Sequence, residues 1–182
     1  MAVLVAYASD HGSTQGVAER IAARLSENGV GAKALPVDEA GDPSDYEAVV
    51  LGSAIHSMAW LPEATRYAKR HAAGLAGRPV WLFSVSLVGD AGSALPGPIA
   101  ARARKMKERR PPKATVEVRE AVKPRGERSF TGAIEPDHWG RLGRTVFRAL
   151  GGKWGDHRDW DEVDAWARSI AAELTAPGRS DS

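Results

Sequence analysis

The sequence has 182 residues, 43% hydrophobic and 26% charged with a net charge of +2, a globular balance that argues against extensive disorder. It contains no cysteine, which excludes disulfide scaffolds, iron–sulfur clusters and thiol catalysis. No apolar run approaches the roughly 20 residues that span a bilayer. Residues 1–7 are too short and lack the basic n-region of a signal peptide, so we expect a cytoplasmic location.

The first third of the chain alternates apolar runs with an amphipathic stretch. Residues 3–7 are apolar and rich in β-formers, and they predict a buried strand. Apolar residues then recur every fourth position over residues 17–25, which predicts a helix. Residues 32–37 and 46–51 predict two further strands, the second of which ends at Gly52.

The middle of the chain continues the alternation. Pro62 fits the first turn of a helix over residues 61–75, which Gly77 ends. Residues 79–85 form the most apolar run and predict a fourth strand. After a glycine-rich loop, residues 98–109 predict a helix that the pair Pro111-Pro112 stops.

The last part of the chain contains one ambiguous segment. Residues 115–122 are rich in β-branched residues but also fit a short helix, so both assignments stay open. Residues 129–134 predict a fifth strand. Asp159 and Glu162 have the spacing of a capping box and predict the start of the final helix.

Strands that alternate with helices predict right-handed βαβ units and a parallel sheet covered on both faces. We therefore expect a three-layer, doubly wound α/β fold with a five-stranded parallel sheet, in one domain of residues 1–174 followed by a flexible tail of residues 175–182. Ligands of such sheets bind beyond the carboxyl ends of the strands, where the strand order reverses. Three loops should share this site, at residues 9–14, 53–60 and 86–92.

The first of these loops has the chemistry of a phosphate site. Ser9, Ser13 and Thr14 supply hydroxyl groups, and Gly12 lets the backbone approach a ligand closely. The helix that follows offers unpaired N–H groups and the positive end of its dipole. Alternatively, Ser13 only caps this helix.

Other catalytic motifs are missing from the sequence. It has neither the G-x-x-x-x-G-K-[ST] motif of P-loop NTPases nor the G-x-S-x-G elbow of hydrolases. No histidines or carboxylates have metal-ligand spacing, so we expect no metal and assign no catalytic residue.

Four segments carry a resemblance to a known family. VLVAYASDHGSTQGVAERIA resembles the first strand, phosphate loop and helix of flavodoxins. YEAVVLGSAIHSMAWLPEATRYAKRH and RPVWLFSVSLVGD look most like the flavodoxin-domain branch that includes menaquinone-dependent protoporphyrinogen oxidase, and GDHRDWDEVDAWARSIAAEL is similar to the end of that branch.

The resemblance implies a flavodoxin-like fold and non-covalently bound FMN. It implies redox chemistry, either electron transfer to a partner protein or FMN-dependent oxidation of a substrate such as a porphyrin with a quinone acceptor. The phosphate would lie on the first loop, and the isoalloxazine ring between the second and third loops. The implied cofactor-binding residues are Ser9, Asp10, His11, Gly12, Ser13, Thr14, Ser53, Ala54, Ile55, His56, Trp60, Ser86, Leu87, Val88 and Gly89.

The sequence departs from the usual flavodoxin pattern at two places. Asp10 interrupts the phosphate loop and must point its carboxylate away from a phosphate. Trp60 either stacks on the ring or packs its helix, and Trp139 or Trp154 could cover the second ring face. These departures favour an alternative function, a flavodoxin-fold binding module without cofactor, which the intact turn at residues 12–14 opposes.

A basic segment begins at Arg102 and ends at Arg128, with eleven basic and four acidic residues. It is either a solvated surface or a docking surface for an acidic redox partner, an acidic substrate or an anionic membrane. In the last case the protein would lie at the inner face of the membrane. Few aromatic residues interleave these charges, so we expect no nucleic-acid partner.

Overall fold

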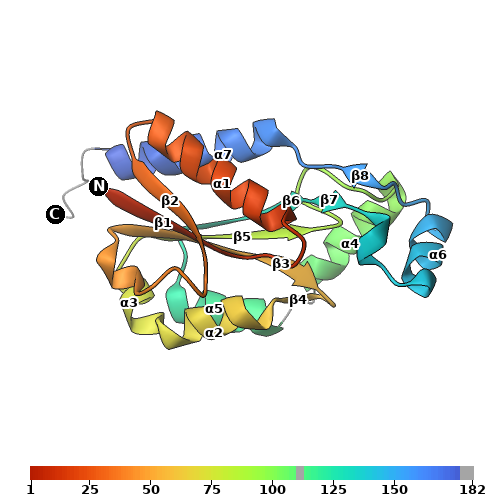
Figure 1. Cartoon of the computed structure of the whole chain (residues 1–182), viewed down its shortest axis with the longest axis horizontal. Helices are drawn as coiled ribbons and strands as arrows, with labels where there is room; N and C mark the ends of the chain where they lie inside the picture. Colours follow the sequence, from red (N-terminus) through yellow and green to blue (C-terminus); the bar gives the residue numbers. More distant parts are fainter. Residues whose placement is uncertain (110–112, 177–182) are drawn as a thin grey trace.

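The structure is a computed structural model that describes residues 1–109 and 113–176. Five parallel strands form its central sheet, in the order β2-β1-β3-β5-β6 (Figure 1). Their bounds are β1 Ala2–Ala8, β2 Gly31–Pro36, β3 Ala48–His56, β5 Val80–Ser86 and β6 Gly126–Thr131. The order reverses between β1 and β3, which confirms the expected doubly wound sheet.

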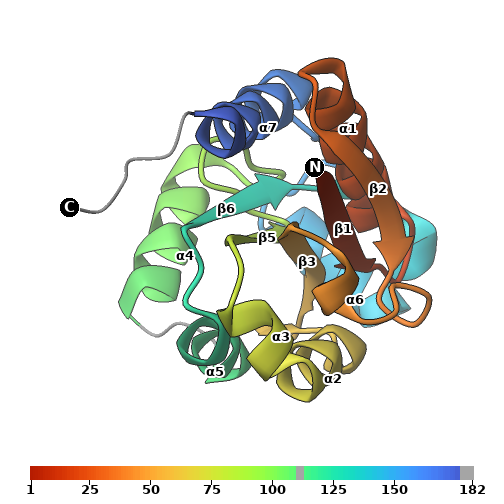
Figure 2. The same cartoon turned by 90° about the vertical axis from the view of Figure 1, so that its left-hand side faces the viewer.

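Helices cover both faces of the sheet and make the three layers seen in Figure 2. One face carries α1 (Ser13–Glu27) and α7 (Trp160–Thr175), and the other carries α2 (Pro62–Arg70), α3 (Ala72–Ala76) and α5 (Lys113–Val122). The remaining elements are η1 Pro43–Asp45, β4 Ala59–Trp60, α4 Gly97–Arg109, β7 Ala133–Ile134, η2 Pro136–His138, α6 Arg141–Ala149 and β8 Gly155–Asp156.

Strand β1 shows how the sequence builds two cores. Val3, Val5 and Tyr7 pack with α1 and α7, whereas the intervening Leu4 and Ala6 pack with residues of α2 and α3. All five are buried, because successive side chains of a strand point to opposite faces and both faces are covered. A continuous apolar run is therefore the correct signal for this strand.

Strand β3 is longer than the sequence predicts. We expected it to end at Gly52, but it continues to His56. Gly52 pairs with Phe83 on β5, and a Cβ atom built on Gly52 would lie 2.1 Å from two carbons of the Phe83 ring. This glycine therefore makes room for a neighbouring aromatic ring and does not end the strand.

The single helix expected over residues 61–75 is wrong, because the chain leaves the helical conformation at His71 (φ −105°, ψ 18°). The short α3 that follows packs against η1 and buries Leu75. The fifth strand lies at Gly126–Thr131, three residues earlier than expected, since residues 133–134 pair antiparallel with β8 instead.

The ambiguous segment at residues 115–122 is helical and belongs to α5. Val118 and Val122 lie one helical turn apart, and both are buried in the core that contains α2. Helical spacing of the buried residues has overridden the β-propensity of the segment. The expected helix stop at residues 111–112 and most of the expected tail, residues 177–182, lie outside the described residues.

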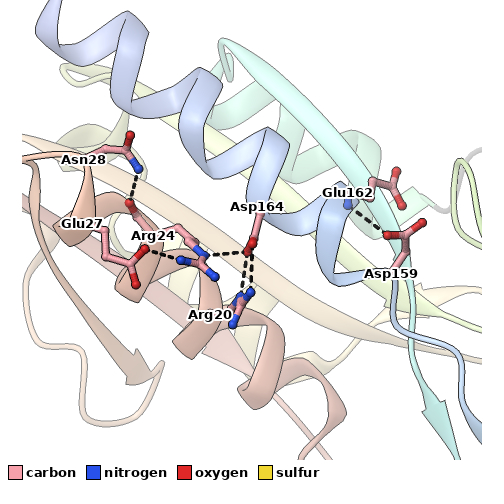
Figure 3. A network of polar contacts seen from close by, with 7 residues as sticks. All are labelled: Arg20, Arg24, Glu27, Asn28, Asp159, Glu162 and Asp164. Atoms are coloured by element: carbon pink, nitrogen blue, oxygen red, sulfur yellow. Dashed lines mark hydrogen bonds and ion pairs between the residues drawn. The ribbon is translucent and has the colours of Figure 1, made fainter.

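Asp164 joins the two helices on one face of the sheet (Figure 3). Its carboxylate, 10% exposed, accepts hydrogen bonds from Arg20 Nε (2.7 Å) and Nη2 (2.9 Å), and Arg24 Nε lies 3.0 Å away. The bonds from Arg20, supported by Arg24, lower the pKa of Asp164 to about 2. At the N-terminus of α7, the N-cap residue Asp159 accepts a hydrogen bond from the Glu162 N–H, which confirms the predicted start of this helix.

We expect Asp164→Asn to lower the free energy of unfolding at neutral pH by about 2 kcal/mol, because it removes a charged hydrogen-bond acceptor. The pKa of Asp164 is lower in the folded than in the unfolded state. Its contribution is therefore complete above about pH 4 and is lost as the pH falls toward 2. In urea titrations, the difference in the free energy of unfolding between parent and variant should shrink as the pH falls from about 4 toward 2.

The matched control is Asp161→Asn, which changes an exposed carboxylate in the first turn of the same helix. This control substitution should lower the free energy of unfolding by at most a few tenths of a kcal/mol. Equal losses in the two variants, or a pH-independent loss in Asp164→Asn, would contradict the assigned role of the arginine pair.

Candidate functional site at the carboxyl ends of the strands

A cavity of about 470 Å³ lies at the carboxyl ends of the central strands. This volume is in the range of small-molecule and cofactor sites, about 300–1,000 Å³. Four segments of the chain meet there. The lining residues are Ser9, Asp10, His11, Ser13, Thr14, Ala54, Ile55, His56, Ser57, Val85, Ser86, Leu87, Gly132, Ala133, Ile134, Glu135, His138, Trp139 and Gly140.

The loop between β1 and α1 presents unpaired hydrogen-bond donors to the cavity. Gly12 adopts a left-handed conformation (φ 78°) at the N-cap position, and no side chain caps the helix. Ser13 Oγ accepts a hydrogen bond from the Ala133 N–H (2.8 Å), so the alternative in which Ser13 only caps the helix is wrong. Ser9 Oγ is buried without a hydrogen-bond partner. The first N–H groups of α1 are thus available to an anion.

Asp10 and three histidines form a polar cluster at this loop. Asp10 Oδ2 lies 3.3 Å from His11 Nε2 and 3.6 Å from His56 Nε2. The ring of His138 stacks on that of His11, with centroids 3.9 Å apart and an interplanar angle of 8°. The Asp10 carboxylate, which should point away from a phosphate, is therefore engaged by two imidazoles.

The second expected loop is a tight hairpin. The end of β3 pairs antiparallel with β4, and Ser57 and Met58 form the turn with positive φ angles of 47° and 64°. Such turns favour Asn-Gly, so Ser-Met is an unfavourable choice at this position. The hairpin brings His56 to the cavity.

Two of the predicted site residues in this hairpin lie away from the cavity. Trp60 is buried, and its Nε1 donates a hydrogen bond to Ser84 Oγ (2.9 Å). Ser53 is also buried and accepts a hydrogen bond from the Leu61 N–H (2.9 Å). Both residues attach β4 and α2 to the sheet.

The loop after β5 is held from behind by α4. Lys107 Nζ donates hydrogen bonds to Ser86 Oγ (2.9 Å) and to the Val88 carbonyl (2.6 Å), and burial lowers the pKa of this ammonium group. Arg104 Nε donates to the Gly89 carbonyl (2.8 Å). Ser86 and Leu87 face the cavity, whereas Val88 and Gly89 do not line it.

Residues 132–140 form a fourth wall that the three-loop prediction missed. Among these residues the sequence predicts a role only for Trp139, as a cover for one face of the flavin ring. It lies between the cavity and an aromatic group on and beside α6, with ring centroids 5.3 Å from Phe147 and 5.8 Å from Trp154. Trp154 packs behind Trp139 and does not line the cavity.

The parallel sheet order, the uncapped helix at its switch point and the adjoining cavity define an α/β protein with a flavodoxin-like fold. The sequence profile of the family described as flavodoxin domain matches residues 4–160. The chain therefore belongs to the flavodoxin domain family.

Solved structures agree with this fold. A flavodoxin from the domain Archaea is similar at 15% identity and a TM-score of 0.59, in a match that covers 96% of this chain and 99% of that flavodoxin. A mutant flavodoxin from Pseudomonas aeruginosa is similar at 16% identity and a TM-score of 0.56, in a match that covers 97% of this chain and 100% of that flavodoxin. A rubredoxin:oxygen oxidoreductase from Desulfovibrio gigas is similar at 16% identity and a TM-score of 0.60 over 96% of this chain. The match covers 36% of that enzyme, about a third of its length. No curated protein gives a significant match.

Proposed function

We propose that the chain binds FMN non-covalently and serves in electron transfer or in FMN-dependent oxidoreduction. The observation that carries this proposal is the uncapped N-terminus of α1, where the buried Ser9 Oγ lacks a hydrogen-bond partner. Buried polar groups are normally satisfied, so such an atom beside a cavity is a candidate ligand contact. Membership of the flavodoxin domain family supports the choice of FMN.

The chain's own residues would bind and orient the cofactor. Residues 9–14 would hold the phosphate through N–H and hydroxyl groups, since no Lys or Arg is among the described residues that line the cavity. Residues 54–57, 86–87 and Trp139 would enclose the isoalloxazine ring, leaving Ser53, Trp60, Val88 and Gly89 as supporting residues. When bound, FMN supplies one- and two-electron redox chemistry.

Lys107 is placed to influence the redox chemistry. Its half-buried ammonium group hydrogen-bonds Ser86, which lines the cavity. A positive charge beside a flavin site favours the reduced, anionic flavin. Lys107 would affect the flavin indirectly, by fixing the loop at Ser86 and Val88 and through its charge, so it is a positioning residue and not a ligand of the flavin.

The proposal is tested by titrating purified, flavin-free protein with FMN and following flavin fluorescence. Saturation at one FMN per chain supports it. The competing function is a cofactor-free binding module. No saturable binding of FMN would exclude the flavoprotein function and favour that module.

Trp139 should quench the fluorescence of bound flavin. We expect Trp139→Ala to raise the emission of the bound cofactor several-fold, because removing an aromatic donor beside the ring removes the quencher. The measurement is the emission of FMN-saturated protein. Trp60→Phe is the control, and it should lower the melting temperature while leaving the emission unchanged, since Trp60 is buried away from the cavity. The reverse pattern would place the ring against Trp60.

A narrower activity, protoporphyrinogen oxidation with a quinone acceptor, remains part of this proposal, as does contact with a membrane through residues 102–128. Several basic residues of this segment have internal partners: Arg104 and Lys107 hold the loop after β5, and Arg119 pairs with Glu127. Arg102, Lys105 and Arg109 are exposed and would carry the docking, while Arg110 lies outside the described residues. Within residues 1–109 and 113–176, no helix is long and apolar enough to cross a membrane.

A further inference from the structure

Three potential metal ligands converge at the mouth of the cavity from two separate segments. Asp10 and His11 belong to the loop after β1, whereas His56 ends β3. One ligand atom from each residue lies within 4.8 Å of the other two. The sequence offered no sign of this group, because His56 meets the other two residues only through the pairing of β1 with β3.

The two separations from Asp10 match those of neighbouring ligands around one ion, and the ligand atoms of His11 and His56 lie within 4.8 Å of each other. In a tetrahedral zinc site with bonds of about 2.0–2.1 Å, neighbouring ligand atoms lie roughly 3.3 Å apart. Asp10 Oδ2 lies 3.3 Å from His11 Nε2 and 3.6 Å from His56 Nε2. Two imidazoles and one carboxylate suit a borderline divalent ion such as Zn²⁺ or Co²⁺ better than Mg²⁺ or Ca²⁺.

The third histidine of the cluster, His138, supports this arrangement but supplies no ligand to it. His138 stacks face to face on His11. An imidazole binds a metal through a nitrogen at its edge, in the plane of the ring. Stacking on the face therefore restrains His11 and leaves its Nε2 free for an ion.

We propose that Asp10, His11 and His56 bind one divalent transition-metal ion, with Zn²⁺ as the preferred ion. Three protein ligands leave a coordination position open, and since all three residues line the cavity, that position can take an anionic oxygen of the cavity's ligand. The ion would supply the positive charge that the lysine- and arginine-free lining lacks. Metal binding by these three residues does not depend on the proposed flavin function.

The test uses the full chain, freed of flavin and metal, and Co²⁺ as a coloured probe for Zn²⁺. We expect one Co²⁺ per chain, visible absorption bands of a four-coordinate ion, and their loss when Zn²⁺ displaces Co²⁺. Asp10→Asn, His11→Gln and His56→Gln should each weaken binding at least about tenfold. His157→Gln is the control, since the His157 ring bonds the Lys153 carbonyl away from this group.

A gain-of-signal variant tests the assignment directly. The chain has no cysteine, so His56→Cys introduces its only thiol. If position 56 is a ligand, Co²⁺ bound to this variant should show a near-ultraviolet sulfur-to-cobalt charge-transfer band. His138→Gln should bind Co²⁺ within about threefold of the parent, because His138 stacks on the ring face of His11 and is not among the three residues whose ligand atoms converge.

Three results would overturn the proposal: no saturable binding at one ion per chain, equal weakening in His157→Gln and His11→Gln, or no charge-transfer band in His56→Cys. A large loss in His138→Gln would also overturn the three-ligand assignment. FMN binding is measured separately in the presence of a chelator. Failure of metal binding is thus distinguishable from failure of flavin binding.

Discussion

Replacement of Thr14 by aspartate should abolish tight binding of FMN, with a loss of at least about 100-fold, or roughly 2.7 kcal/mol. Thr14 is 1% exposed, lies in the first turn of α1 and lines the cavity. A carboxylate there would face the phosphate in surroundings that screen charge poorly. Riboflavin lacks the phosphate, so its affinity should fall much less. Calorimetric titration of the flavin-free protein with each flavin measures both effects.

Thr14→Asn is the matched control, because asparagine has the shape of aspartate without its charge. We expect it to retain most of the affinity that Thr14→Asp loses. If the two variants lower the affinity for FMN equally, the loss arises from the shape of the new side chain and not from its charge. If Thr14→Asp binds FMN as tightly as the parent, the phosphate site is elsewhere.

The strands and the first phosphate-type loop could be predicted because their signals are local. A buried parallel strand is a continuous apolar run, and β1 has that pattern with both faces covered. The loop at residues 9–14 follows directly from such a strand into a helix, which fixes its place in a doubly wound sheet. The sequence predicts the end of β3 wrongly at Gly52, because the role of this glycine depends on Phe83, a residue on another strand.

The fourth wall of the cavity could not be predicted in the same way, because its position is set by distant contacts. Residues 132–140 reach the cavity after β6, where Ala133 bonds Ser13 across 120 positions of sequence. One signal in the sequence was the presence of three large aromatic residues, Trp139, Phe147 and Trp154, within a short segment. They indicate that this segment packs against the rest of the protein and is not a solvent-exposed loop. The histidine cluster is equally non-local, since His11, His56 and His138 come from three segments.

Gly52→Ala should be the most destabilising small substitution in the sheet, with a loss of about 3 kcal/mol in the free energy of unfolding. The added Cβ would lie 2.1 Å from Cε1 and Cζ of Phe83. Phe83 is 1% exposed and packs against Phe130 and Trp166, so its ring has no space into which to move. Urea unfolding followed by tryptophan fluorescence measures the loss.

Two further variants separate this clash from the general effect of losing a glycine. Gly77→Ala adds the same methyl group where no heavy atom lies within 4 Å, and it should change stability by less than about 0.5 kcal/mol. Phe83→Leu removes the ring edge that the added methyl group would meet. The double variant Gly52→Ala/Phe83→Leu should therefore lose less free energy of unfolding than the two single variants lose together. Additive losses would show that the two residues do not interact. In that case β3 would need glycine at position 52 for its backbone conformation, and not to make room for the ring of Phe83.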